Sequence, residues 1–419
     1  MLQSPWSRIG MRNLARHPKR TLLTAMGLAV GFFMSVVLVG WSQGLVNQMV
    51  ENSTSLLGGQ LEIHDAEFLP ERSLYDTIGG RDGVDLDQLL TRATSDVRVV
   101  AAAPRVYAGG LVSSGNSTVA GMLMGVDPER EVALSRFLDV LTAGRLPRPG
   151  QNELVVGTEM ARQLEAEIGG ELVVVAPAAD GSMGNDLFTL VGTYRTGLGE
   201  IDSAFAVLPV EDLQALVVLS AGRVHEIAVS TQDPWVAEEV AAAVTTAVDG
   251  EVLEAEVVPW TELNPALVEY AELASSMYGV ILVIVFGLAI FGVANTMLMA
   301  TYERRREFAV MLAVGTTPRG VVLSVLYEAL ALGLFALVLG VVVTGPVMIW
   351  WHNAPPDLTG LVGEIEMMGS VVSLTMQVEY DVNFAVLTAV ALLATAVLAA
   401  FYPAVRASRV PPADTLSGL

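Results

Sequence analysis

Four long apolar segments limit the folds that are open to this chain. They cover approximately residues 22–45, 278–301, 321–350 and 384–401. A helix needs about 17 to 25 mostly apolar residues to cross a bilayer core of ~30 Å, and each segment is long enough. The first follows a basic stretch, as a signal peptide would, but its apolar run is too long and no small-residue cleavage pattern follows it. The sequence therefore predicts four transmembrane helices.

Basic residues in the short segments beside the membrane lie on one side of it. They precede the first span, separate the second from the third and follow the fourth: Arg8, Arg12, Arg16, Lys19, Arg20, Arg304, Arg305, Arg306, Arg319, Arg406 and Arg409. Residues 352–383 contain no lysine or arginine but carry five acidic residues. Because cytoplasmic segments are enriched in arginine and lysine, both termini are predicted to be cytoplasmic.

The long segment between the first and second spans is predicted to be an α/β domain outside the cytoplasm. Within it, β-rich runs such as 153–156, 172–175, 187–194 and 225–231 alternate with stretches of helical periodicity such as 158–167, 210–219 and 235–248. We therefore expect an α-helical membrane protein with an inserted α/β domain. Its expected parts are a cytoplasmic amphipathic helix (1–20), a first transmembrane helix (21–50), the extracytoplasmic domain (51–264), a stalk with the second transmembrane helix (265–301), a cytoplasmic segment (302–320), a third transmembrane helix (321–350), an external loop (351–383), a fourth transmembrane helix (384–402) and a cytoplasmic tail (403–419).

Composition and motifs exclude several classes of function. The net charge of −22, from 45 acidic and 23 basic residues, argues against a nucleic-acid partner. The absence of cysteine excludes thiol catalysis and disulfides. A phosphate-binding P-loop needs a lysine after its glycine, but the single lysine, Lys19, lies between Pro18 and Arg20. No hydrolase, metalloprotease or dinucleotide motif occurs, so we predict no catalytic and no metal-binding residue.

Scattered polar residues receive structural interpretations. His64 and His225 could meet in the fold, but each is predicted to be a satisfied or exposed histidine. The external carboxylates are expected to form a solvated, self-repelling surface rather than a catalytic pair or a cation site. Glu328 lies near the cytoplasmic end of the third span, where snorkelling or helix capping is favoured over proton relay.

Residues 177–186 are predicted to form a short acidic loop between two strands. Its polar, glycine-containing composition suggests the hypothesis that it docks a soluble partner outside the membrane. The residues assigned to that role are Pro177, Asp180, Met183 and Asp186.

The cytoplasmic segment between the second and third spans is predicted to couple the chain to another protein. Membrane orientation alone would account for its arginines, but not for two glutamates that flank them one helical turn apart. Glycine followed by proline then predicts a turn into the next helix. The coupling residues are Glu303, Arg304, Arg305, Arg306, Glu307, Gly315, Pro318 and Arg319.

Three stretches resemble one family of transporter subunits. Residues 303–317 fit an E-R-x-x-E-[FI] helix followed by an A-x-G-x-[ST] turn, and residues 403–416 fit P-A-x-x-A-[SA]-x-x-x-P-x-x-x-L. Residues 11–23 resemble the first cytoplasmic helix and span of the same family. These features, in the order of one span, outer domain and three spans, resemble the FtsX-like permeases of MacB-type ABC transporters. Within the outer domain, 58–64 and 191–202 are similar to stretches of lipoprotein-releasing permeases of the LolC/LolE type.

The resemblance implies a non-catalytic permease subunit in the bacterial inner membrane, with an outer domain of MacB periplasmic-core type in the periplasm. It further implies a second permease copy or paralogue and a separate cytoplasmic ABC ATPase, which binds ATP and Mg²⁺, while this chain holds no cofactor. The implied function is the release of lipoproteins from the membrane, possible partners being a lipoprotein substrate and a periplasmic carrier. Two alternatives stay open: FtsX-like regulation of a cell-wall hydrolase and MacB-like efflux of amphiphilic substrates.

The resemblance also implies an apolar slot for an acylated substrate between the first and second spans. The residues expected to line it are Met34, Leu38, Trp41, Met277, Ile281 and Val285. Lipid-facing or helix-packing roles are the alternative for each of them.

Overall fold

The computed structural model describes residues 18–69, 72–80, 85–115, 117–135, 140–248, 255–357, 365–367, 370–372, 375 and 377–417. The chain divides into two compact units. The membrane unit comprises residues 1–46, 271–358 and 375–419, and the outer unit comprises 47–270 and 359–374. The predicted amphipathic helix at 1–20 falls mostly outside the described residues, as does about a third of the predicted external loop at 351–383.

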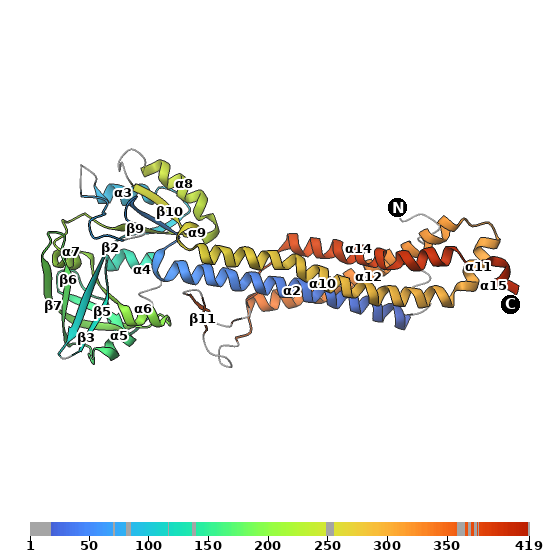
Figure 1. Ribbon diagram of the computed structural model, residues 1–419, viewed down its shortest axis with the longest axis horizontal. Helices are drawn as coiled ribbons and strands as arrows, with labels where there is room; N and C mark the ends of the chain where they lie inside the picture. The colour runs from blue at the N-terminus through green and yellow to red at the C-terminus, as the bar shows by residue number, and fades with distance from the viewer. Residues whose placement is uncertain are drawn as a thin grey trace. The chain divides into compact units, whose positions relative to one another are not determined.

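Four long helices form the body of the membrane unit (Figure 1). They are α2 (Pro18–Ser53), α10 (Pro265–Glu303), α12 (Pro318–Asn353) and α14 (Val382–Ser408). Each contains an 18-residue window with a mean hydropathy between 2.4 and 2.6, and even the shortest exceeds the ~30 Å of a bilayer core at 1.5 Å per residue. Among the described residues these four helices can span a membrane, which confirms the prediction. Among its described residues the unit also contains two shorter helices, α11 (Arg305–Ala313) and α15 (Pro412–Ser417).

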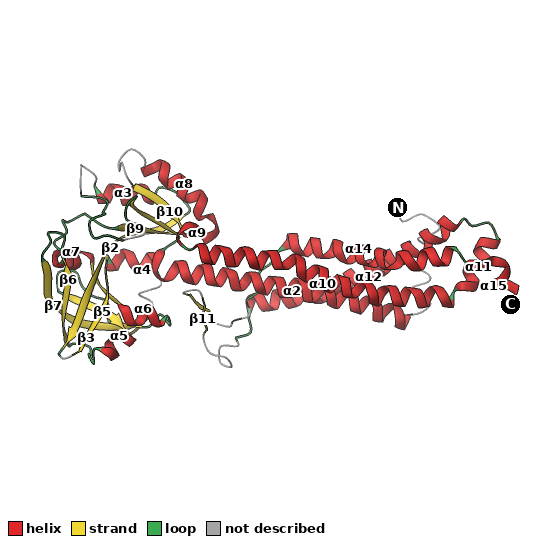
Figure 2. Cartoon of the chain, viewed as in Figure 1, coloured by secondary structure: helices red, strands yellow, loops and turns green. Residues whose placement is uncertain are grey.

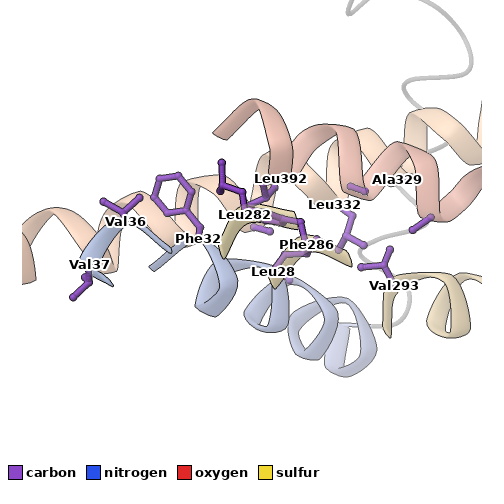
Figure 3. Close-up of a cluster of buried hydrophobic side chains, with 14 of the residues drawn as sticks. Leu28, Phe32, Val36, Val37, Leu282, Phe286, Val293, Ala329, Leu332 and Leu392 are labelled. Carbon is purple, nitrogen blue, oxygen red and sulfur yellow. The ribbon is translucent and has the colours of Figure 1, made fainter. Parts of the chain in front are cut away.

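Apolar side chains from all four long helices meet in one core (Figure 3). Leu28 and Phe32 come from α2, and Phe286 comes from α10. Small residues allow close approach of the helices, as is common in membranes. A Cβ added at Gly340 of α12 would lie only 3.0 Å from Cδ1 of Phe32, and one at Gly333 would lie 3.0 Å from Cβ of Ala396 on α14.

The segment before α14 lies against the outer part of α2. The N–H of Glu379 donates to the carbonyl oxygen of Gly40 at 2.9 Å, and Val378 is fully buried. A Cβ at Gly44 would lie 2.1 Å from the carbonyl oxygen of Gln377, a backbone atom that cannot move aside cheaply. The four-residue spacing of Gly40 and Gly44 therefore leaves room for another backbone to dock on the helix.

A ten-stranded mixed sheet organises the outer unit (Figure 2). Its strands are β1 (Leu61–Asp65), β2 (Val99–Ser114), β3 (Ser117–Val126), β4 (Leu141–Gly144), β5 (Glu153–Gly157), β6 (Glu171–Pro177), β7 (Met183–Tyr194), β8 (Phe205–Pro209), β9 (Glu226–Thr231) and β10 (Ala255–Pro259). The order is β10-β1-β9-β2-β3-β8-β5-β7-β4, and β6 pairs with β2 and β7. A separate antiparallel pair is formed by β11 (Ile365–Met367) and β12 (Ser370–Val372).

Short helices connect and cover the strands. They are α3 (Leu86–Ala93), α4 (Pro128–Leu134), α5 (Thr158–Gln163), α6 (Gly199–Ala204), α7 (Val210–Leu216), α8 (Ala237–Val248) and α9 (Trp260–Leu263), with single turns at Thr54–Gly58 and Pro234–Val236. Aspartates cap two of them: Asp85 accepts from the N–H of Asp87 at the start of α3, and Asp127 accepts from Glu129 and Arg130 at the start of α4. The predicted mixed α/β domain is thus confirmed.

Half of the predicted loop at 177–186 is strand, which corrects the sequence interpretation. β6 runs to Pro177 and β7 begins at Met183, so only residues 178–182 form the turn of a hairpin. The N–H of Ala178 donates to the carbonyl of Ser182 at 2.9 Å, and Gly181 supplies a φ of +84°. Polar and glycine-rich composition marks a turn, but it does not show how far the flanking strands extend.

All four membrane helices extend beyond the predicted apolar spans. α12 runs from Pro318 to Asn353 rather than from 321 to 350, and α14 ends at Ser408 rather than at 402. The extra turns of α14 have a buried face, because Ala404 and Ala407 pack with Phe308 of α11 and with Val321 and Val325 of α12. Hydropathy gives the length of a membrane core, whereas helix ends depend on packing outside it.

Candidate functional site

Arg304 lies at the junction of three helices. It sits between α10 and α11, with its Nη1 2.8 Å from Oε2 of Glu328 on α12 and its Nε 2.9 Å from Oε2 of Glu307. The side chains of Arg304 and Glu328 are only 12% and 10% exposed. Neither snorkelling nor helix capping describes Glu328, since its carboxylate accepts from Arg304; this contact corrects the sequence interpretation. The pair fastens the start of α11 to α12.

Glu303 and Glu307, which were predicted to couple the cytoplasmic segment to another protein, have partners within the chain. Oε2 of Glu303 lies 2.7 Å from Nη1 of Arg20 on α2, and Glu307 accepts from Arg304. Both carboxylates remain about half exposed, at 53% and 48%. Their first role is therefore to join α10 to α2 and to position Arg304.

The predicted turn between α11 and α12 is present. Gly315 has a φ of +100°, which glycine adopts without strain. The hydroxyl of Thr317 accepts from the N–H of Gly320 at 3.2 Å, and Pro318 opens α12. Arg319 is exposed in the first turn of α12.

One face of α11 is buried and the other carries exposed apolar residues. Phe308 and Ala309 are buried, and Phe308 packs against α12 and α14. On the exposed face, Val310 and Val314 are 47% and 83% exposed, in line with the exposed Arg306. The spacing of four residues places Arg306, Val310 and Val314 in a row, which we call the α11 face. The two valines were not among the predicted coupling residues, although their four-residue spacing from Arg306 was a usable signal.

The six residues assigned to an apolar slot do not share one environment. Met34, Leu38 and Met277 are 52%, 39% and 45% exposed. Trp41 and Ile281 are partly buried and pack against the core of the membrane unit. At Val285 the two helices come together, since a Cβ at Gly31 of α2 would lie 3.2 Å from Cγ1 of Val285. An open apolar surface is therefore offered by Met34, Leu38 and Met277.

In the β6–β7 hairpin, the carboxylates assigned to a partner-binding loop shape the structure. Asp180 accepts from the N–H of Ser182 at 2.9 Å, and hydrogen bonding to Ser182 lowers the pKa of Asp180. Asp186 accepts from Nδ2 of Asn152 at 3.1 Å. Pro177 ends β6 and pairs with Met183, which is 65% exposed. Met183 is thus the apolar contact that the hairpin offers near its turn.

A buried polar cluster lies on β2 in the outer unit. Arg105 is fully buried; it donates to Glu131 through Nη2 at 2.5 Å and Nε at 3.2 Å, and to Glu226 through Nη1 at 3.4 Å. Tyr107 donates to Glu226 at 2.7 Å. The expectation that external carboxylates form a solvated surface is wrong for Glu131 and Glu226, because a buried guanidinium compensates their charge.

A cavity of about 600 Å³ lies beside this cluster, lined in part by Glu62, His64, Arg72 and Trp260. Burial, and after it the charge of Glu226, raises the pKa of Glu62 to about 8. Oε2 of Glu62 has no hydrogen-bond partner among the described residues. Glu62 is therefore held largely protonated at neutral pH, a further departure from the solvated surface that the sequence suggested.

The two histidines of the outer unit do not form a pair. The ring of Phe68 contacts both, with centroid distances of 5.8 Å to His64 and 5.5 Å to His225. Nδ1 of His225 accepts from the N–H of Tyr107 at 2.9 Å and Nε2 donates to the carbonyl of Leu74 at 3.2 Å, while burial lowers the pKa of His225 to about 4. His225 is the satisfied histidine that was predicted. Within the described ranges, no group of three or more histidine, aspartate or glutamate side chains is placed to hold a metal ion.

Two family models match the chain along most of its length. The MacB-like periplasmic core domain matches residues 21–247, more than half of the sequence, and the FtsX-like permease C-terminal model matches residues 279–412. The chain belongs to the MacB-like periplasmic core domain family. The FtsX-like match contains every residue of the predicted coupling segment, the α11 face and α14 as far as 408.

The chain is also similar to curated relatives and to one solved structure. The chain is 24% identical to the lipoprotein-releasing system transmembrane protein LolC of Xylella fastidiosa, over 92% of this chain and 94% of that protein. It is 25% identical to LolC of Neisseria meningitidis, over 97% of this chain and 98% of that protein. The periplasmic region of MacB from Actinobacillus actinomycetemcomitans matches with 12% identity and a TM-score of 0.36, covering 52% of this chain and 97% of that one. The resemblance noted in the sequence is confirmed.

Proposed function

We propose that this chain is the permease subunit of an ABC transporter that releases lipoproteins from the inner membrane of a bacterium. The observation that carries the proposal is the alignment of nearly the whole chain with LolC proteins. In this arrangement both termini are cytoplasmic and the outer unit lies in the periplasm, as the distribution of arginine favours. The sequence contains no P-loop lysine, so ATP and Mg²⁺ bind to a separate ABC ATPase.

The ATPase docks on the α11 face in this proposal. An exposed row of one arginine and two valines offers both charge and apolar area, the combination found at specific interfaces. Movement of α11 would reach α12 through Arg304 and Glu328, and α2 through the contact of the adjacent Glu303 with Arg20. The internal ion pairs therefore transmit motion, while the exposed residues make the contact.

A second permease copy or paralogue is part of the proposed assembly. In the most apolar window of α10 only 17% of the residues are buried, compared with 33% to 39% in the other three long helices. A second copy would cover the remaining surface of α10. The acylated end of the substrate would enter along Met34, Leu38 and Met277, where each CH₂ removed from water contributes about 0.8 kcal/mol. A periplasmic carrier would receive it at the β6–β7 hairpin.

The docking assignment is tested with the full chain co-expressed with its ATPase. Val314→Asp and Arg306→Glu are expected to abolish co-purification of the ATPase and release of lipoprotein from proteoliposomes. Val97→Asp is the matched control, because Val97 is 86% exposed but lies in the outer unit. Normal ATPase retention by both α11 variants would overturn the assignment.

Val314→Asp and Arg306→Glu test the docking assignment more directly than charge reversal at Glu303 and Glu307 does. Charge reversal at those positions would break the contacts with Arg20 and Arg304, so loss of the ATPase could follow from a disturbed membrane unit. The α11 face variants leave both ion pairs in place. If ATPase binding survives but a cell-wall hydrolase is activated and no lipoprotein is released, the FtsX-like alternative is favoured instead.

A further inference from the structure

A basic pocket lies between the ends of α10 and α14 and the start of α11. Its volume is about 450 Å³. Its lining includes three arginines and two tyrosines: Arg305, Arg406, Arg409, Tyr302 and Tyr402. Among the side chains that the structure describes, no carboxylate lines the pocket. The pocket therefore concentrates positive charge at the end of the membrane unit that carries the basic residues.

Three nearby carboxylates that the structure describes form ion pairs with arginines outside the pocket. Glu303 contacts Arg20, and both Glu307 and Glu328 contact Arg304. Arg406 instead donates to the hydroxyl of Tyr402 at 3.2 Å, and its guanidinium lies 5.6 Å from the ring centroid of Tyr302. The two tyrosines thus hold Arg406 without cancelling its charge, which leaves the pocket ready for an anion.

The pocket continues into apolar surface on the side of the membrane. On α14, Leu398, Tyr402 and Arg406 follow at intervals of four residues and are all exposed, Leu398 by 64%. On α10, the exposed Met299 precedes the exposed Tyr302 by three residues. Both spacings place the residues on one face of their helix. On each helix an exposed apolar side chain is therefore followed, towards the pocket, by an exposed tyrosine. On α14 the tyrosine is followed by Arg406.

We propose that this pocket binds the headgroup of an anionic phospholipid of the cytoplasmic leaflet. The phosphate oxygens meet the guanidinium groups, whose planar forks match phosphate geometry, and the acyl chains lie along Met299 and Leu398. Tyrosines at the level of the headgroups are typical of the membrane interface. Basic pockets between transmembrane helices on the cytoplasmic side suit such lipids. The adjoining apolar surface favours a lipid over a soluble anion or the ATPase.

Short-chain lipids test this site on the full chain in neutral detergent. The probes are dihexanoyl phosphatidylglycerol, dihexanoyl phosphatidylcholine and inorganic phosphate, and the readouts are native mass spectrometry and the shift in melting temperature. We expect phosphatidylglycerol to bind at least tenfold more tightly than either of the others. Arg406→Gln with Arg409→Gln should remove that preference.

Matched variants separate the site from general charge attraction. Arg406→Lys with Arg409→Lys keeps the charge and the membrane orientation but loses the forked donors, so binding should weaken at least threefold without vanishing. Arg319→Gln removes an exposed arginine outside the pocket and should leave binding unchanged. The proposal would be overturned if the two lipids bound equally tightly, or if Arg319→Gln weakened lipid binding as much as the pocket variants. It would also be overturned if inorganic phosphate bound as tightly as phosphatidylglycerol, or if the ATPase displaced the lipid.

Discussion

The guanidinium of Arg304 and the carboxylate of Glu328 lie 2.8 Å apart and join the start of α11 to α12. Both side chains are almost buried, so neither charge is well solvated. The cation–π contact of Arg304 with Phe308, at 5.1 Å, further fixes the guanidinium on α11. This contact links the segment proposed to bind the ATPase with the helices that cross the membrane.

Removing one member of this pair should destabilise the membrane unit. Arg304→Gln removes the guanidinium that compensates the charge of Glu328, so the free energy of unfolding should fall by about 3 kcal/mol. The double variant Arg304→Gln with Glu328→Gln should lose less than the sum of the single variants, because the two side chains interact. Unfolding of the full chain in detergent measures these losses. Arg306→Gln, at an exposed position, should change stability by less than about 0.5 kcal/mol. Additive losses would contradict the coupling.

A methyl group at Gly44 should dislodge the segment that lies against α2. In Gly44→Ala the new Cβ would meet the carbonyl oxygen of Gln377 at 2.1 Å, so that segment must move. The chain has no cysteine, so Val378→Cys can report on its fully buried position through maleimide labelling. Maleimide labelling of Val378→Cys should be slow in the otherwise unchanged chain and much faster when Gly44→Ala is also present. Gly27→Ala is the control, because nothing lies within 4 Å of a Cβ at that position. Equal labelling with Gly44→Ala and with Gly27→Ala would show that the segment around Val378 does not pack against Gly44.

Glu62 should make the outer unit less stable as the pH rises. The pKa of Glu62 is about 8 in the folded chain, whereas its ordinary value, which applies to the unfolded chain, is 4.5. Between pH 4.5 and 8 the folded chain therefore binds more protons than the unfolded chain, and the free energy of unfolding falls as the pH rises. The pKa of His225 is shifted in the opposite direction, from 6.5 to about 4. His225 therefore changes the stability mainly below pH 6.5, where the unfolded chain binds the extra proton. From pH 6.5 to 8 the loss of stability due to Glu62 should therefore amount to about 1 to 2 kcal/mol, because its carboxyl is already half ionised in the folded state at pH 8.

Glu62→Gln should remove most of this slope, since the amide does not titrate. Unfolding of the full chain, followed by tryptophan fluorescence at several pH values, provides the measurement. Glu171→Gln, at an exposed position on β6, should keep the slope of the parent chain. A slope that persists in Glu62→Gln would show that another group is responsible.

The hairpin hypothesis is best tested at Met183. Met183→Glu places a charge on the exposed apolar residue beside the turn and should reduce lipoprotein transfer to a carrier by roughly tenfold, the effect of about 1.4 kcal/mol. Deletion of residues 179–184 is less informative, because Gly184 packs so closely that a Cβ there would lie 2.0 Å from the carbonyl oxygen of Leu216. Ile168→Glu, at another exposed apolar position, is the control. Unchanged transfer with Met183→Glu would exclude the hairpin as the carrier site.

Local sequence signals located the four membrane helices and some of the strands of the outer sheet. The four apolar segments correspond to α2, α10, α12 and α14, and strands β5, β6, β7 and β9 lie where β-rich runs were found. Gly315 and Pro318 were correctly read as a turn and a helix start. These features follow from the length, periodicity and backbone preferences of short stretches, so neighbouring residues alone are enough to specify them.

Contacts between distant residues were decided by the tertiary structure. Arg20 and Glu303 are 283 positions apart, and no local pattern indicates that they meet. Likewise, composition placed the external carboxylates in solvent, whereas Glu62, Glu131 and Glu226 are buried around Arg105 or beside it. Burial of a charge is tolerated only where folding supplies a countercharge or a proton, and that depends on which strands become neighbours. The sequence by itself therefore determined the spans, the α/β character of the outer unit and the turns, while the packing of helices and strands decided which charged side chains are paired, protonated or left free to bind.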